Sequence, residues 1–213
     1  MTALHTIDST VAEVDAVHDS FAASHLPWDL EFDPRVTPTT SRVDLGAPWV
    51  VGCTVGRMHG FRRPAHIRRT PGEYTAVLMV HSGMEILTQC GESTRVPAGT
   101  AALWDGVRPV ECFSADTLVK DTMFVPRDAL AAVVPDLDSA FVRTIDDSST
   151  LRLLTSWLDV ARQSALDPDT ARTAGRMALD LLYSAIARCR GDAADSREVM
   201  LLRVKDFLDR RPS

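Results

Sequence analysis

Residues 91–105, GESTRVPAGTAALWD, set two glycines and a proline ahead of a short apolar run. Gly91 supplies the backbone freedom of a turn, Pro97 fixes φ, and Gly99 permits a second tight bend. The apolar run at residues 101–104 is typical of a strand that enters a core. The stretch therefore predicts a turn followed by a buried strand of a small β-barrel.

The composition limits the class of protein. The chain has 213 residues, of which 45% are hydrophobic and 24% are charged, which is ordinary for a globular protein with a real core. No apolar run approaches the roughly 20 residues that cross a bilayer, and the mixed, acidic N-terminus is unlike a signal peptide. The net charge of −6 argues against strong DNA binding by this sequence itself.

The cysteines point to a reducing compartment. Cys53, Cys90, Cys112 and Cys189 are widely spaced and form no C-x-x-C motif. Because no export signal precedes them, we expect reduced thiols instead of disulfides or a zinc site. We therefore expect a cytoplasmic protein.

Short apolar runs separated by turns predict the remaining strands of the barrel. We expect strands at residues 49–55, 74–81, 84–89, 100–104, 109–114 and 117–125. Turn signals between them, such as Asp105-Gly106, are typical of β-barrels and β-sandwiches.

The segment 56–70 carries five arginines. Because apolar residues interrupt it and strands flank it, we expect a solvated strand-and-loop face and not a nucleic-acid patch. One of these arginines could still reach the mouth of the barrel and pair with a carboxylate of a ligand.

Apolar residues at helical spacing predict the helices. We expect helices at residues 8–24, 128–134, 147–166, 168–190 and 196–211. Asp147 or Ser148 is expected to cap the third of these, and Gly191 to end the fourth. The fourth carries a wide apolar stripe, which could pack against the barrel, the preceding helix or the same helix of a second chain.

The chain shows no pattern for catalysis or metal binding. It contains no nucleophile elbow, Walker A motif or dinucleotide-binding motif. Among the histidines, His59, His66 and His81 lie nearest to the expected strands, but no pair has the i, i+2 spacing that aims two imidazoles at one ion. We expect no catalytic residues, no metal and no cofactor.

A ligand cavity could lie inside the barrel. The candidate lining residues are apolar or aromatic and lie on the expected strands: Trp49, Cys53, Tyr74, Met79, Trp104 and Phe113. For each residue alone, filling of the core is the simpler interpretation, because small barrels are often filled. As a set, they could line a cavity with few polar groups.

Together, these residues resemble the N-terminal effector-binding and dimerisation domain of AraC/XylS-type transcription regulators, which contains a cupin-like barrel. The Gly-Pro-Gly spacing at residues 91–99 is similar to a cupin motif in which a histidine follows the second glycine, but residues 100–103 contain none. The strand at residues 74–80 and the segment 123–130, MFVPRDAL, also resemble this domain, and residues 151–190 resemble its dimerisation helices.

The resemblance implies an α+β fold in three parts. An N-terminal helix or arm and a cupin-like antiparallel β-barrel would occupy residues 1–126, and an amphipathic helical dimerisation segment residues 127–195. Residues 196–213 would begin a DNA-binding domain whose two helix-turn-helix motifs are missing from this sequence. The function implied is non-enzymatic: a metal-free barrel binds a small-molecule effector, the chain forms a homodimer, and DNA is contacted only through the missing domain.

The fourth expected helix would then supply the dimer contacts, with Met177, Leu181, Leu182 and Ile186 as candidates. Two alternatives stay open. A metal-dependent cupin enzyme, such as an isomerase or dioxygenase, would need an ion held by His59, His66 or His81. A pure dimerisation scaffold would have a solid barrel with no cavity.

Overall fold

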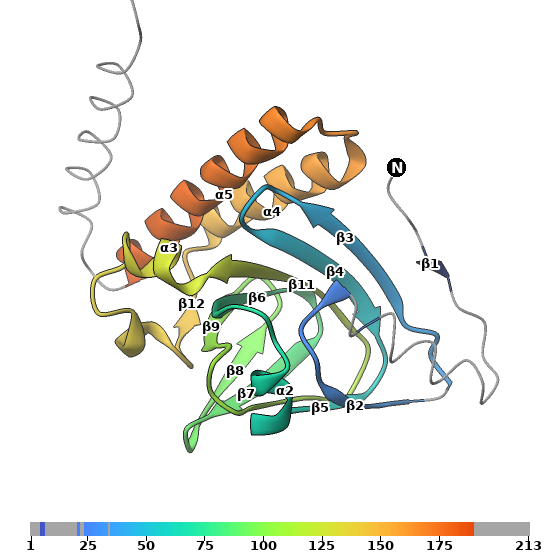
Figure 1. Cartoon of the computed structure of the whole chain (residues 1–213). Coiled ribbons are helices and arrows are strands. Elements are labelled where there is room, and N and C mark those ends of the chain that lie inside the picture. The colour runs from blue at the N-terminus through green and yellow to red at the C-terminus, as the bar shows by residue number, and fades with distance from the viewer. Residues whose placement is uncertain (1–4, 7–20, 22–23, 34, 190–213) are drawn as a thin grey trace, which may run out of the picture.

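The computed structural model describes residues 5–6, 21, 24–33 and 35–189. Two antiparallel sheets face each other, and two long helices cover the outer face of one of them (Figure 1). The helix expected at residues 8–24 falls largely outside the described residues, and the one at residues 196–211 falls wholly outside them. Among the described residues, no helix is long and apolar enough to cross a membrane.

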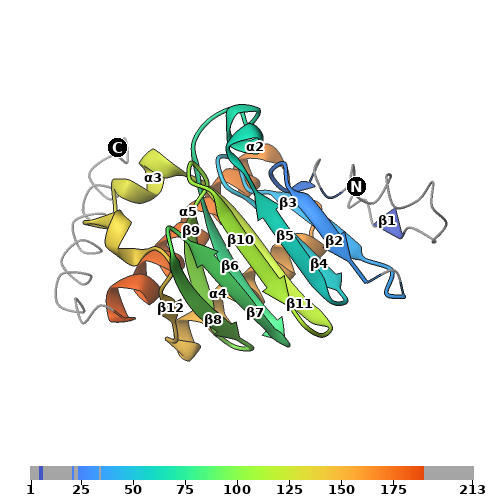
Figure 2. The same ribbon diagram turned by 90° about the horizontal axis from the view of Figure 1, so that it is seen from below.

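The first sheet has seven strands in the order β1-β3-β4-β11-β6-β9-β12, and the second has five in the order β2-β5-β10-β7-β8 (Figure 2). The first contains β1 (His5–Thr6), β3 (Thr39–Asp44), β4 (Trp49–Val55), β6 (Tyr74–Ser82), β9 (Ala101–Asp105), β11 (Leu118–Pro126) and β12 (Thr144–Ile145). The second contains β2 (Asp29–Phe32), β5 (Met58–Arg62), β7 (Met84–Gln89), β8 (Glu92–Pro97) and β10 (Val110–Ser114). All six expected strands are present, and β1, β2, β3, β5, β8 and β12 lie outside the six expected ranges.

The stretch at residues 91–105 forms two turns and two strands. Cys90 and Gly91, with φ of 54° and 82°, make a two-residue turn between β7 and β8, as in hairpins whose central residues both have positive φ. Gly99, with φ of 83°, makes the second bend, and all five residues of β9 are buried. The predicted turn and buried strand are confirmed. β8 was missed because most of its residues are not buried, so that it lacks an apolar run.

The first sheet is buried on both faces. Along β6, Leu78 belongs to the core inside the barrel and Met79 to the core under the helices. Along β9, Trp104 faces inward and Leu103 outward in the same way. Because side chains alternate along a strand, a strand buried on both faces reads as a continuous apolar run.

The helices that pack onto this sheet are α3 (Arg127–Ala131), the 3₁₀ helix η1 (Leu137–Ala140), α4 (Ser148–Gln163) and α5 (Pro168–Cys189). The short α2 (Pro64–Arg68), between β5 and β6, buries none of its residues. Asp147 caps α4 by accepting a hydrogen bond from the backbone N–H of Thr150. The described part of residues 127–195 shares a hydrophobic core with the barrel strands, and β12 within it pairs with β9.

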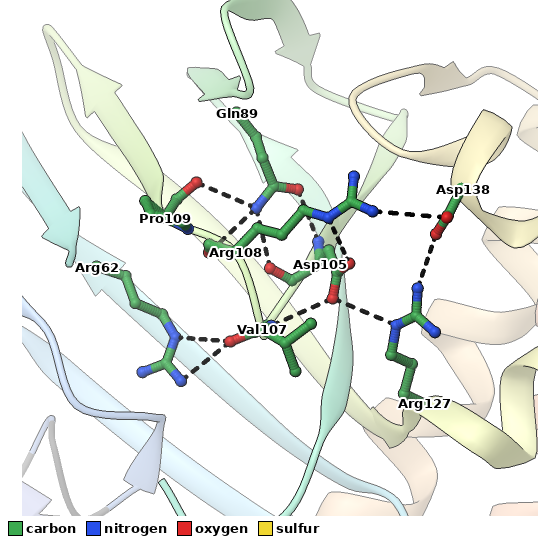
Figure 3. Close-up of polar contacts among 9 residues, drawn as sticks. Arg62, Gln89, Asp105, Val107, Arg108, Pro109, Arg127 and Asp138 are labelled. Atoms are coloured by element: carbon green, nitrogen blue, oxygen red, sulfur yellow. Dashed lines mark hydrogen bonds and ion pairs between the residues drawn. The ribbon is translucent and has the colours of Figure 1, made fainter. Parts of the chain in front are cut away.

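A polar network around Asp105 closes one end of the barrel (Figure 3). The Gln89 side chain of β7 donates to the Asp105 carbonyl at 2.9 Å and accepts from its N–H at 2.8 Å, which joins the two sheets. The buried Asp105 carboxylate lies 3.3 Å from Arg108 Nε and 3.5 Å from Arg127 Nε. Both arginines also pair with Asp138. Contacts from Gln89, Arg108 and Arg127 therefore fix the position of the turn that follows β9.

The expectation that residues 56–70 form a solvated face holds for Arg57, Arg63, Arg68 and Arg69, which are exposed, but not for Arg62. This part of the chain forms β5 and α2, and Arg62 is only 1% exposed. Its guanidinium donates to the carbonyls of Pro27 and Gly106 at 2.9 and 3.2 Å and to Thr70 Oγ1 at 2.7 Å. Burial lowers the pKa of Arg62 to about 10, so the group stays charged at neutral pH. The arginine that reaches the barrel end thus holds three segments of the chain together.

Substitution of Gly175 tests how α5 docks. A Cβ at this position would lie 2.1 Å from the carbonyl oxygen of Leu45, which is a backbone atom. In an exposed helix, glycine to alanine stabilises by about 1 kcal/mol. Here we expect Gly175→Ala to lower the free energy of unfolding by about 1–3 kcal/mol, because the backbones must separate. Urea denaturation followed by circular dichroism measures the change.

The exposed Thr173 on the same helix supplies the control. Thr173→Ala should change the free energy of unfolding by no more than about 0.5 kcal/mol. A Gly175→Ala variant that is more stable than the wild type would contradict close packing of α5 on the loop after β3.

Candidate functional site

The barrel interior holds a small cavity with aromatic walls. Its volume is about 20 Å³, room for about one water molecule. Phe21, Trp28, Trp104 and Phe124 supply the aromatic walls, and the Trp28 and Trp104 rings meet edge to face at 5.3 Å. The interior is therefore nearly filled by side chains of the strands and of the residues before β2.

Four of the six candidate lining residues lie on the inner side of the barrel. Trp104 borders the cavity. Cys53 is buried in the core inside the barrel, and the partly buried Trp49 and Tyr74 pack against that core. The Trp49 indole also donates to the Ser24 carbonyl at 3.1 Å. Whether any of them touches a ligand stays a prediction.

The prediction that Met79 and Phe113 line the cavity is wrong, because both lie outside the barrel interior. Met79 belongs to the core under the helices. Phe113 follows the inward-facing Cys112 on β10 and packs instead against the ring of His59 at 5.6 Å. Alternation along a strand sends neighbouring side chains to opposite faces, and the apolar runs did not show which face was the inner one.

A buried ion pair borders the cavity. Lys120 Nζ of β11 lies 2.7 and 2.9 Å from the two carboxylate oxygens of Glu85 on β7, and the two residues are 6% and 1% exposed. Burial works against the charge on Lys120, but attraction to Glu85 outweighs it and raises the pKa of Lys120 above its usual value. The two charges balance, so the interior is polar at this point without a net charge.

His25 borders the cavity with an unsatisfied ring nitrogen. Its Nδ1 lies 3.2 Å from Ser24 Oγ, whose own hydroxyl donates to the Phe21 carbonyl. Nδ1 is therefore the donor, and Nε2 carries the lone pair. Among the described residues, no donor reaches the buried Nε2. Burial, followed by repulsion from Lys120, lowers the pKa of His25 well below its usual value, so the ring is neutral.

A second polar cluster lies behind the ion pair, on the outer side of β11. Asp121 follows Lys120 in the chain, and its carboxylate accepts a hydrogen bond from Arg162 Nη2 of α4 at 2.7 Å. His81 Nε2 lies 3.0 Å from the other carboxylate oxygen. The β6–β11 register shifts between Val119 and Lys120, and such irregularities re-aim side chains. β11 therefore connects the barrel interior to α4.

Sequence reasoning missed Lys120, Glu85 and His25. A signal existed for the first: Lys120 and Asp121 interrupt the otherwise apolar run LVKDTMFV of β11. Adjacent charges inside such a run indicate that both faces of a strand meet polar partners. No comparable signal marks His25, which reaches the barrel from outside the expected strands.

The histidines named for a metal do not converge. His59, His66 and His81 each lie beside a different carboxylate: Glu111, Asp29 and Asp121, in that order. Within the part of the chain that the structure describes, no three His, Cys, Asp or Glu residues are grouped so as to hold a metal ion. Burial raises the pKa of the Cys53 thiol to about 12, which keeps it protonated.

The prediction of contacts with a second chain is wrong for two of the four candidate residues. Leu182 and Ile186 are 0% and 3% exposed, in the core shared by α5 and the first sheet, so they are not available to a second chain. Leu181 is partly buried against the same core, whereas Met177 is 45% exposed. The apolar stripe predicted a packing face correctly, but most of it packs within the chain.

The comparisons with known proteins support the fold. The sequence matches no protein-family model, and no curated protein matches it. The structure is similar to the crystal structure of the AraC-like transcriptional activator CuxR, with a TM-score of 0.73 and 14% identity over 88% of this chain and 70% of that chain. The predicted α+β fold, a cupin-like barrel followed by helices, is confirmed.

Weaker similarity extends to other cupin-like structures. The cupin domain of an XRE family transcriptional regulator from Enterobacter cloacae gives a TM-score of 0.33, with 11% identity over 47% of this chain and 98% of that chain. Ectoine synthase from P. lautus gives 0.34, with 11% identity over 42% of this chain and 64% of that chain. Neither similarity is strong enough to indicate a function.

Substitutions in the ion pair test the balance of buried charge. Lys120→Met should lower the free energy of unfolding by about 3–5 kcal/mol, because the Glu85 carboxylate is left buried without a partner. The double variant Lys120→Met, Glu85→Leu removes both charges and should recover most of that loss. Urea denaturation of the two variants measures the difference. A double variant as unstable as the single one would show that the charges do not compensate each other.

The pH dependence of stability tests the His81 contact. A hydrogen bond to Asp121 raises the pKa of His81 in the folded state, so protonation favours folding. The stabilisation is complete below the unfolded pKa of about 6.5 and is lost as the pH rises through the higher folded pKa. Thermal unfolding should therefore separate wild type from His81→Gln most at acidic pH. A difference that does not vary with pH would contradict the contact.

Proposed function

We propose that this chain is the effector-binding domain of a bacterial transcription regulator, without enzymatic activity of its own. The observation that carries the proposal is β11, which holds a buried ion pair inside the barrel and, at the next residue, an ion pair to α4. Likeness of fold to an AraC-like transcriptional activator supports it. The alternative of a metal-dependent cupin enzyme gains no support from His59, His66 and His81, which contact different carboxylates.

In the proposed mechanism, a small molecule near Lys120 changes the position of β11. Asp121 would then change its contact with Arg162, and α4 would move with it. Such coupling requires that the molecule bind two arrangements of the domain with different affinity. The contact between Asp121 and Arg162 is the step at which binding would become a movement of the helices.

We further propose that the domain forms a homodimer through the outer sides of α4 and α5. Leu153 and Val160 of α4 are 63% and 56% exposed, and Met177 of α5 is 45% exposed. A second chain packed on α4 and α5 would cover these apolar side chains. A DNA-binding domain attached to this one would supply the contact with DNA.

Ligand screening combined with a promoter assay tests effector sensing. Small metabolites that raise the melting temperature are confirmed by calorimetry, and a full-length protein is assayed with and without Arg162→Ala. We expect this variant to bind the metabolite and DNA but to lose most of its response, because the link from β11 to α4 is cut. Promoter activity that ignores every substitution in the barrel and at Arg162 would overturn the proposal.

Substitution of Met177 tests the dimer. Met177→Glu should shift the protein toward monomers in light scattering, because a carboxylate would be buried in the interface. Met84→Glu is the matched control, since Met84 is 41% exposed on β7, in the sheet that faces away from α4 and α5. A wild-type protein that is monomeric at high concentration would contradict the dimer.

A further inference from the structure

Part of the cavity wall does not belong to the barrel. Phe21, His25 and Trp28 border the cavity from the segment before β2, whereas every other bordering residue lies on a strand. β2 is the edge strand of the second sheet (Figure 2). These three residues therefore reach the interior from an edge of the sandwich.

Phe21 and His25 act together as an insert. Their rings stack with centroids 3.8 Å apart and 2° between the planes, and the two residues are 3% and 8% exposed. The His25 ring meets Phe124 of β11 edge to face at 5.9 Å. Two flat rings thus fill the space next to Phe124, and only about 20 Å³ is left empty.

The insert fits the barrel imperfectly. No donor among the described residues reaches the buried His25 Nε2, and a buried acceptor that lacks a partner destabilises the arrangement that buries it. The described backbone of the segment is held by side chains, with Ser24 accepting from Trp49 and Pro27 accepting from Arg62. A molecule of similar shape that satisfies the polar groups of the interior could replace the two rings.

The charges inside the barrel indicate whether that molecule would be charged or neutral. Lys120 and Glu85 already balance each other at 2.7 Å. An anion would compete with Glu85 for Lys120 and leave one carboxylate buried without a partner, which is strongly unfavourable. A neutral group can instead contact a Lys120 proton or a Glu85 oxygen without disturbing the pair.

We propose that Phe21 and His25 form a plug in the effector site, and that the effector is a flat, uncharged aromatic molecule with a hydrogen-bonding group that displaces them. This inference rests on the proposed effector-binding function and adds the class of ligand and the competition with the plug. The effector could then reach the barrel interior only when Phe21 and His25 leave it. Binding therefore requires opening of the plug.

Two substitutions should act in opposite directions. Phe21→Ala removes one ring and weakens the plug, so the barrel should open more often and bind ligand more tightly. His25→Leu keeps much of the volume but removes the unsatisfied nitrogen, so the plug should open less often and binding should weaken. Phe113→Ala is the control, because this ring lies on the outer side of the second sheet. A merely structural role would make both plug variants less stable and more open.

Labelling of Cys112 measures opening without any ligand. Cys112 borders the cavity and is buried. The exposed Cys90 and Cys189 are replaced by serine and the equally buried Cys53 by alanine, so that Cys112 is the one remaining thiol. Under native conditions with Ellman's reagent, we expect the slow, buried-thiol phase to be at least about tenfold faster in Phe21→Ala and about fivefold slower in His25→Leu. Phe113→Ala should leave the rate nearly unchanged. Faster labelling in both plug variants, or no change in either, would overturn the plug.

Calorimetry with phenol, indole and benzoate tests the class of ligand. We expect the two neutral probes to bind, more tightly in Phe21→Ala and about fivefold more weakly in His25→Leu, and benzoate not to bind. Preferential binding of benzoate would overturn the uncharged class and leave the effector-binding function standing. Failure of all three probes to bind to either wild type or Phe21→Ala would overturn the inference, whereas the effector-binding function is decided separately by the promoter assay.

Discussion

Burial of one sheet on both faces is the constraint on which the structure depends. The first sheet packs its inner face into the barrel and its outer face against α4 and α5. Each of its central strands must therefore supply alternate side chains to two cores, as Leu78 and Met79 do. The close approach of α5 at Gly175 follows from the same constraint, because the helices must seal the outer face. Barrel and helices are thereby parts of one packed unit.

The same alternation lets β11 carry charge to both sides of the sheet. Lys120 pairs inward with Glu85, and Asp121 pairs outward with Arg162. Buried charges are tolerated only when they are paired, so the positions of β7, β11 and α4 depend on one another. A shift of β11 along its axis would strain both pairs at once. This coupling is the physical basis of the proposed link between barrel and helices.

The volume of the cavity alone does not show whether the barrel is a sensor or a solid scaffold. What distinguishes the two is the origin of the side chains that fill the space. Phe21 and His25 come from outside the strands, and within the described part of the chain the buried His25 Nε2 has no partner. A buried acceptor without a partner destabilises the packing that buries it, so a molecule that satisfies this nitrogen could replace the two rings. The filling is therefore better interpreted as a removable part of the barrel.

The sequence by itself determined the order of most strands and helices, the turns at Gly91 and Gly99, and the cap at Asp147, because turn and capping chemistry is local. It also determined that Trp104 lies on a buried strand. Only the tertiary structure decided which face of each strand is the inner one, which excluded Met79 and Phe113, and which part of the α5 stripe stays free. Only the fold brought Lys120 to Glu85 and His25 into the barrel, because these contacts join segments far apart in the chain and leave no periodicity behind.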